Sequence, residues 1–250
     1  MKKLLALLVP VFVFLFEACV DTNEELKRTV NVTVICDLTD PQNLLPIAEP
    51  ILKLLEFNRY KNTEASLKIC PITDKNLNPA EEFHLADCSV TEKDNDNGDP
   101  YHREKIIVTF YDEVKRAFAS FVTGLTPDSS LQHSECFSTI AGELQLMNST
   151  KGVRNYLLLF TDLQENSSLY NCYSFANQKL LIQHPDTVVE LFNATHLLPN
   201  DLNNTKVIFV YQPRTREDDN RFNAMLKIYR KLLEPRGAIV KVQANNNRFN

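Results

Sequence analysis

Short apolar runs alternate with helical patterns along most of this chain, and that alternation constrains its fold more than any other feature. The runs over 155–161 and 206–211 are apolar almost throughout, as in strands that are buried on both faces. We predict six strands, over residues 30–37, 65–70, 105–111, 155–161, 206–211 and 238–242. The sequence therefore predicts an α/β fold, a three-layer sandwich around a mostly parallel, doubly wound sheet.

The clearest helical pattern covers residues 216–234. Acidic residues 217–219 open it, basic residues lie near its end, and Pro235 and Gly237 follow as stop signals. Another helix is expected to follow the first strand as far as Phe57, with Asp40 as its N-cap and a proline in its first position.

Composition excludes several classes of function. The 250 residues carry a formal charge of −5, and an acidic chain is a poor match for the phosphate backbone of nucleic acids. The five glycines fit neither G-x-G-x-x-G nor the Walker spacing, which disfavours a nucleotide site. The five histidines form no H-x-x-x-H pair, and no serine lies in G-x-S-x-G. We therefore expect neither a nucleic-acid partner nor an enzyme.

The N-terminus has the pattern of a secretory signal. Two lysines precede an apolar run over 4–16, which would rise only about 20 Å as a helix and is too short to span a bilayer. Ala18-Cys19 at the end of this run resembles a bacterial lipobox. We expect residues 1–18 to be a signal peptide, Cys19 to carry the lipid, and residues 19–29 to form a tether. This predicts an extracytoplasmic protein held to a membrane by a lipid anchor, periplasmic or at the cell surface; the alternative is plain secretion with cleavage nearby.

One domain is expected over residues 30–250, with an acidic insertion at 71–104 that holds nine acidic and three basic residues. The run 94–99 suggests calcium, but it lacks the spacing of an EF-hand loop, so we interpret the segment as a solvated loop. Besides Cys19, the chain has an odd number of cysteines and no C-x-x-C pair. One or two disulfides are compatible with this count, and no pairing is predicted.

Two acidic residues follow predicted strands: Asp37 closes the first, and Asp162 comes directly after the strand over 155–161. Functional residues of open α/β sheets gather at the carboxyl ends of strands, where the strand order reverses. If the two strands are neighbours, both carboxylates lie over one crevice and, with a hydroxyl such as that of Thr39, offer the hard oxygen ligands that a magnesium-sized ion prefers. The structural alternative is that each carboxylate only accepts hydrogen bonds from backbone N–H groups of the following turn.

The order of elements, together with Asp37-Leu38-Thr39-Asp40 and Phe160-Thr161-Asp162, resembles a von Willebrand factor type A (integrin I-like) domain over residues 28–244. The adhesion site of that family has Asp-x-Ser-x-Ser after the first strand, a Thr at the start of the third helix and an Asp after the fourth strand. The resemblance implies a metal site, with Mg²⁺ as the ion.

The resemblance assigns metal-ligand roles to Asp37, Thr39 and Asp162, and the family's Thr corresponds to Ser130 or Ser134, between which the sequence does not decide. Pro41 stands in place of the second Ser, which makes the implied site a degenerate one.

Three hypotheses about function follow from these residues. The first is a non-enzymatic, adhesion-type module at the cell envelope that binds a protein partner through this crevice. The second is a metal-assisted hydrolase that uses Asp37 and Asp162 to hold the ion and Glu165 as the base. The third is an envelope scaffold component whose site holds no metal.

Overall fold

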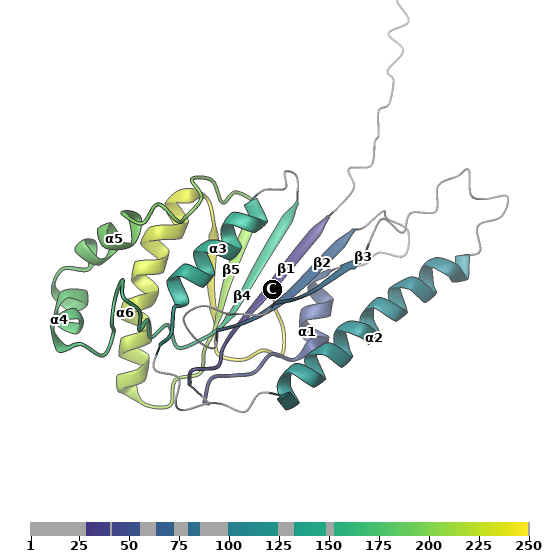
Figure 1. Ribbon diagram of the computed structural model, residues 1–250, viewed down its shortest axis with the longest axis horizontal. Coiled ribbons are helices and arrows are strands. Elements are labelled where there is room, and N and C mark those ends of the chain that lie inside the picture. Colours follow the sequence, from purple (N-terminus) through teal and green to yellow (C-terminus); the bar gives the residue numbers. More distant parts are fainter. Residues whose placement is uncertain are drawn as a thin grey trace, which may run out of the picture.

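The structure of the protein is a computed structural model that describes residues 29–40, 42–55, 64–72, 80–85, 100–124, 133–148 and 153–249. Its strands are β1 (Val30–Asp37), β2 (Ala65–Ile72), β3 (Glu81–Leu85), β4 (Arg154–Phe160), β5 (Thr205–Val210) and β6 (Ile239–Gln243). Its helices are α1 (Ala48–Leu52), η1 (Lys53–Leu55), α2 (Pro100–Gly124), α3 (Cys136–Asn148), α4 (Phe175–Gln183), α5 (Pro185–Asn193), α6 (Arg216–Leu233) and η3 (Glu234–Arg236). Figure 1 shows how these elements are arranged.

The strands form one sheet in the order β3-β2-β1-β4-β5-β6. All neighbouring strands are parallel except β2 and β3, which form an antiparallel pair. This is the doubly wound order, and its direction reverses between β1 and β4. β1 pairs with β4 from Val30 opposite Arg154 to Cys36 opposite Phe160. The strand that carries Asp37 therefore lies next to the strand that precedes Asp162.

Helices cover both faces of the sheet. One core packs α3, α5 and α6 against residues such as Leu157 and Phe209, and the other packs α1 and α2 against their sequence neighbours such as Leu158 and Ile208. Alternate residues of each buried strand thus enter opposite cores. In Figure 1 the two groups of helices lie on opposite sides of the strands. The predicted α/β class, a three-layer sandwich around a mostly parallel sheet, is confirmed.

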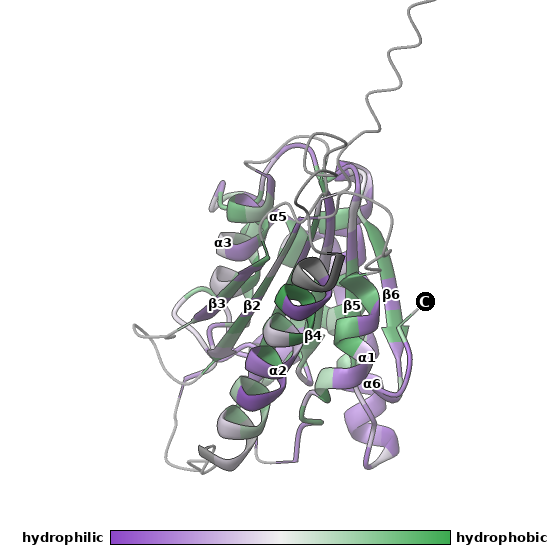
Figure 2. Cartoon of the chain, turned by 90° about the vertical axis from the view of Figure 1, so that its right-hand side faces the viewer, coloured by the Kyte–Doolittle hydropathy of each residue, from purple (hydrophilic) through white to green (hydrophobic). Residues whose placement is uncertain are grey.

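The predicted strand over 105–111 is wrong, because this segment lies inside helix α2. Phe110, Val114 and Phe118 are buried at intervals of four residues, the spacing of a helical stripe, whereas Val108 is 50% exposed. Hydrophilic and hydrophobic residues accordingly mix along α2, while β5 is mostly hydrophobic (Figure 2). The apolar residues over 105–111 are so closely spaced that they resemble a buried strand, and the helical spacing is not apparent within these seven residues.

Two other segments also differ from the prediction. The first helix begins at Ala48 rather than Asp40, whose carboxylate instead accepts a hydrogen bond from the backbone N–H of Gln42 in a turn (2.8 Å). The acidic segment 71–104 is not a loop throughout, since it contributes the edge strand β3 and the start of α2. Residues 94–99 lie outside the described residues.

Several predictions concern residues outside the described ranges, among them the signal peptide over 1–18 and the lipid site Cys19. Cys88 also lies outside these ranges. Within those ranges Cys36, Cys70, Cys136 and Cys172 are buried and unbridged. None of the described helices is both long and apolar enough to cross a bilayer.

Candidate functional site

The carboxyl ends of β1 and β4 bring together the residues of the candidate site. One step beyond the pairing of Cys36 with Phe160, Asp37 meets Thr161, and the Thr161 hydroxyl donates a 2.9 Å hydrogen bond to Asp37 Oδ2. Asp162 follows on the same rim. The sequence singled out Asp37 and Asp162 but assigned no role to Thr161, which the strand register places beside Asp37.

Hydroxyl groups surround the Asp37 carboxylate. Thr39 Oγ1 donates to Asp37 Oδ1 over 2.6 Å, and Ser134 Oγ donates to Oδ2 over 3.4 Å. Because a hydroxyl has two lone pairs as well as its proton, each can donate to Asp37 and still offer oxygen to a cation. Ser134 is thus placed at the site, while Ser130, the other candidate for the family's Thr, lies outside the described residues.

Ser134 reaches Asp37 because the chain before α3 is fixed to the loop after β4. The backbones of Ser134 and Asn166 exchange two hydrogen bonds, of 3.1 and 2.9 Å. Two residues later, at the start of α3, the thiol of Cys136 lies 3.6 Å from Asp37 Oδ2. The Cys136 side chain is fully buried. Cys136 is a contact that the sequence did not predict, since a lone cysteine outside a motif indicates no more than a small buried side chain.

The backbone contacts that the structural alternative predicts for the two aspartates are present, although Asp37 accepts from hydroxyl groups as well. Asp37 Oδ1 accepts from the backbone N–H of Thr39 at 3.1 Å, and Asp162 Oδ1 accepts from that of Gln164 at 3.0 Å. Both carboxylates therefore stabilise the turns that follow their strands. These contacts use one oxygen of each carboxylate, and the hydroxyl contacts of Asp37 come in addition to them.

The turn after Asp162 has an unfavourable backbone. Leu163 has φ of 61°, in the left-handed region that non-glycine residues enter at a cost of roughly 1–2 kcal/mol. Its N–H donates to Thr161 Oγ1 at 2.9 Å, and its side chain is fully buried. Strained turns of this kind cluster at functional sites.

Electrostatically, the site is a pair of buried carboxyl groups that raise each other's cost of ionisation. Burial raises the pKa of Asp37, although donors from Thr39, Thr161 and Cys136 lower it. Burial, reinforced by the charge of Asp37, raises the pKa of Asp162 to about 7. Asp37 is 2% exposed and Asp162 is 8% exposed. Holding both in the charged form at this rim is therefore unfavourable unless positive charge is added.

Arg214 is the guanidinium near this pair, and its charge lowers the pKa of Asp162. Its Nη1 lies 3.0 Å from Asp40 Oδ2 and its Nε lies 3.4 Å from Asp218 Oδ2. Among the described residues, no Lys, Arg or His forms an ion pair with Asp37 or Asp162. The buried pair is therefore left without direct neutralisation.

Glu165 has a different role from the base that the hydrolase hypothesis requires. Its Oε2 accepts a 2.8 Å hydrogen bond from the backbone N–H of Phe137, in the first turn of α3. The side chain is 1% exposed, and burial raises its pKa to about 7 despite donors from Ser167 and Phe137. Glu165 thus fixes the N-terminus of α3 to the loop after β4, where a carboxylate also favours the helix dipole.

An exposed aromatic residue lies near the acidic pair. Tyr173 is 59% exposed, and partial burial together with the charges of Asp162 and Asp37 raises its pKa to about 12. Phe175, two residues later, is 82% exposed. Aromatic side chains are enriched in the cores of protein interfaces.

The donor set fits Mg²⁺ better than a softer ion. Asp37, Thr39, Ser134 and Asp162 offer oxygen only, and Mg²⁺ commonly binds one or two protein carboxylates and keeps several waters. Within the described ranges, no group of three or more His, Cys, Asp or Glu side chains is arranged to hold a metal, so a zinc-type cage is not present there. Any cation at this rim would depend on two carboxylates and on hydroxyl oxygens.

Compared with known proteins, the chain matches no family model and no curated protein. Its function is therefore inferred from its own residues and their geometry.

Proposed function

We propose that this protein is a non-enzymatic binding module of the cell envelope, anchored through a lipid on Cys19, that engages a protein partner at the rim formed by β1 and β4. The observation that carries the proposal is the buried pair of Asp37 and Asp162, which the described residues surround with hydroxyls but do not neutralise. A pair of this kind is suited to a divalent cation.

Asp37, Thr39, Ser134 and Asp162 would hold Mg²⁺ in this proposal. The bound ion would supply positive charge for an oxygen ligand of the partner. The chain's own residues do the rest: Thr161 and Cys136 orient Asp37, and Glu165 keeps Ser134 in place by fixing the start of α3. The strand order and the residues at this rim agree with the resemblance to a von Willebrand factor type A domain, which supports a binding role.

The exposed aromatic residues favour binding over hydrolysis. Tyr173 offers a large contact area near the acidic pair, which suits an interface, and Phe175, two residues later in the chain, is exposed as well. The hydrolase alternative needs a free base, and Glu165 is buried and engaged by Phe137. A scaffold role without metal stays an alternative, and metal binding separates it from the proposal.

The test is capture of envelope proteins by the purified chain in Mg²⁺ and in EDTA, using wild type, Asp37→Asn and the control Asp186→Asn. Asp186 is an exposed acid that pairs with Lys231, away from the site. We expect a partner that is retained by wild type and the control in Mg²⁺ and lost in EDTA and with Asp37→Asn. Partners that bind equally to all three proteins in both buffers would contradict the proposal.

A further inference from the structure

A cavity lies toward the opposite end of the strands from Asp37. It has a volume of about 300 Å³ and is lined by the amides of Gln145, Asn193 and Asn200 and by His196, Leu198 and Arg236. These residues come from the end of α3, the end of α5, the loop that leads into β5, and η3, which precedes β6. All of these segments meet at the amino ends of strands, whereas Asp37 and Asp162 follow carboxyl ends, so the two sites are separate.

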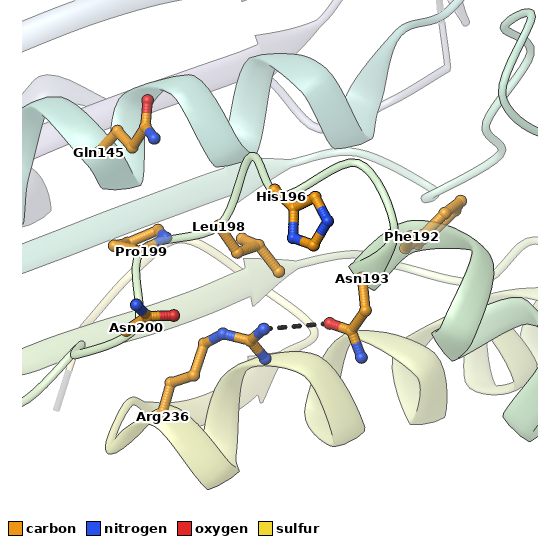
Figure 3. Close-up of a pocket in the computed structure, with 8 residues that line it drawn as sticks. All are labelled: Gln145, Phe192, Asn193, His196, Leu198, Pro199, Asn200 and Arg236. Carbon is orange, nitrogen blue, oxygen red and sulfur yellow. Dashed lines mark hydrogen bonds between the residues drawn. The ribbon is translucent and has the colours of Figure 1, made fainter.

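Arg236 gives this cavity its charge. Its Nη1 donates to the carbonyl of Leu232 at 2.5 Å, and its Nη2 donates to Asn193 Oδ1 at 3.0 Å, as Figure 3 shows for Asn193. Its Nε is buried and has no hydrogen-bond partner. No carboxylate of the described residues forms an ion pair with Arg236. A guanidinium with only neutral partners and one unused donor is unusual, because such donors are normally satisfied.

The other polar side chains add donors around Arg236. Gln145, Asn193 and Asn200 each carry an amide NH₂, and the His196 ring can donate through one or both nitrogens. The backbone of His196 has φ of 55°, which a non-glycine residue adopts at some cost. Its backbone N–H donates a 3.0 Å hydrogen bond to the backbone carbonyl of Asn193. Figure 3 shows its ring between α3 and the side chain of Asn193. Amide and imidazole groups from three segments thus line a cavity that has one cation and no acid.

We propose that this cavity binds a small oxyanion, the phosphate or carboxylate group of a small molecule, with Arg236 as the counter-charge. Planar guanidinium donors match both groups. A volume of about 300 Å³ is at the lower end of ligand pockets, which limits the ligand to a small metabolite or to the charged end of a larger one. Leu198 supplies an apolar wall for the uncharged part of such a ligand.

The test uses isothermal titration calorimetry of the whole chain with inorganic phosphate and, separately, with acetate, in a chloride buffer. The decisive variant is Asn200→Asp, which keeps side-chain size and places a carboxylate in the cavity wall. Arg236→Gln removes the charge, and Arg230→Gln is the control, since Arg230 is half-exposed and pairs with Glu234.

We expect saturable binding of phosphate, acetate or both, at least tenfold weaker with Asn200→Asp and Arg236→Gln and unchanged with Arg230→Gln. The stronger of the two probes identifies the group. If Arg236→Gln fails to fold, Asn200→Asp decides alone. The proposal is overturned if neither anion binds wild type, or if Asn200→Asp binds as tightly as wild type.

Discussion

At the scale of single residues, Asp37 is held by donors rather than by an opposite charge. Thr161 is the most constrained of these donors, because its hydroxyl donates to Asp37 Oδ2 and accepts from the N–H of Leu163, both at 2.9 Å. It therefore connects the end of β1 to the strained turn after β4. Removing the hydroxyl leaves a buried carboxylate oxygen and a buried N–H with one partner fewer.

We predict that Thr161→Val lowers the free energy of unfolding by about 1–3 kcal/mol, because buried groups that lose a partner carry the full cost of desolvation. Urea denaturation of the two proteins measures this difference. The matched control is Thr123→Val on the exposed side of α2, expected within about 0.5 kcal/mol of wild type. Equal effects of the two substitutions would mean that the Thr161 hydroxyl has no special role.

The raised pKa of Asp162 predicts a pH dependence of stability. The folded chain holds the Asp162 proton up to about pH 7, whereas an unfolded Asp releases it near pH 4, so between these values the folded state binds more protons. Stability is therefore highest below the unfolded pKa and falls as pH rises through the folded pKa.

Asp162→Asn keeps the acceptor for the Gln164 N–H but cannot ionise. We expect the metal-free variant to lose about 2–4 kcal/mol less stability than wild type between pH 4 and pH 8. Urea denaturation in EDTA across this range measures the difference between the two curves. Parallel curves would show that Asp162 does not titrate with a raised pKa.

At the scale of elements, α2 shows where sequence patterns mislead. The run over 105–111 is dense enough in Ile, Val, Phe and Tyr to suggest a buried strand, yet only Phe110 in it is fully buried. The helical period emerges only when Val114 and Phe118 are included. In contrast, α6 was predicted almost to the residue, because acidic residues open it and the stop signals Pro235 and Gly237 follow it closely. In the structure Thr215 caps its start, and Gly237, with φ of 94°, ends the short helix η3 that comes directly after α6.

Substitutions within α2 distinguish helix from strand in solution. Val114→Ala is expected to lower the free energy of unfolding by about 1–3 kcal/mol because Val114 is fully buried. Val108→Ala is expected to change it by no more than about 0.5 kcal/mol, since Val108 is half-exposed and Ala favours a helix. Denaturation curves of the two variants provide the measurement. A larger loss from Val108→Ala would support the strand.

At the scale of the whole molecule, sequence patterns predicted the layers and the two acids, and the chain's topology supplied what they could not. Strands β1 and β4 are far apart in sequence, and only the observed order makes them neighbours. Ser134 and Cys136 reach Asp37 through backbone pairing between two loops, which leaves no mark in residue types. The edge strand β3 is polar and partly exposed. Its sequence therefore lacks the apolar run that identifies the central strands.

We propose above that the rim of β1 and β4 holds a divalent cation. Calorimetric titration of Mg²⁺ and Mn²⁺ into the folded chain at pH 8, where the carboxyl of Asp162 is ionised, tests it most directly. We expect one ion per chain, at least tenfold weaker binding with Asp37→Asn and Asp162→Asn, and unchanged binding with Asp186→Asn. No uptake by folded wild type, or equal uptake by all four proteins, would contradict the claim.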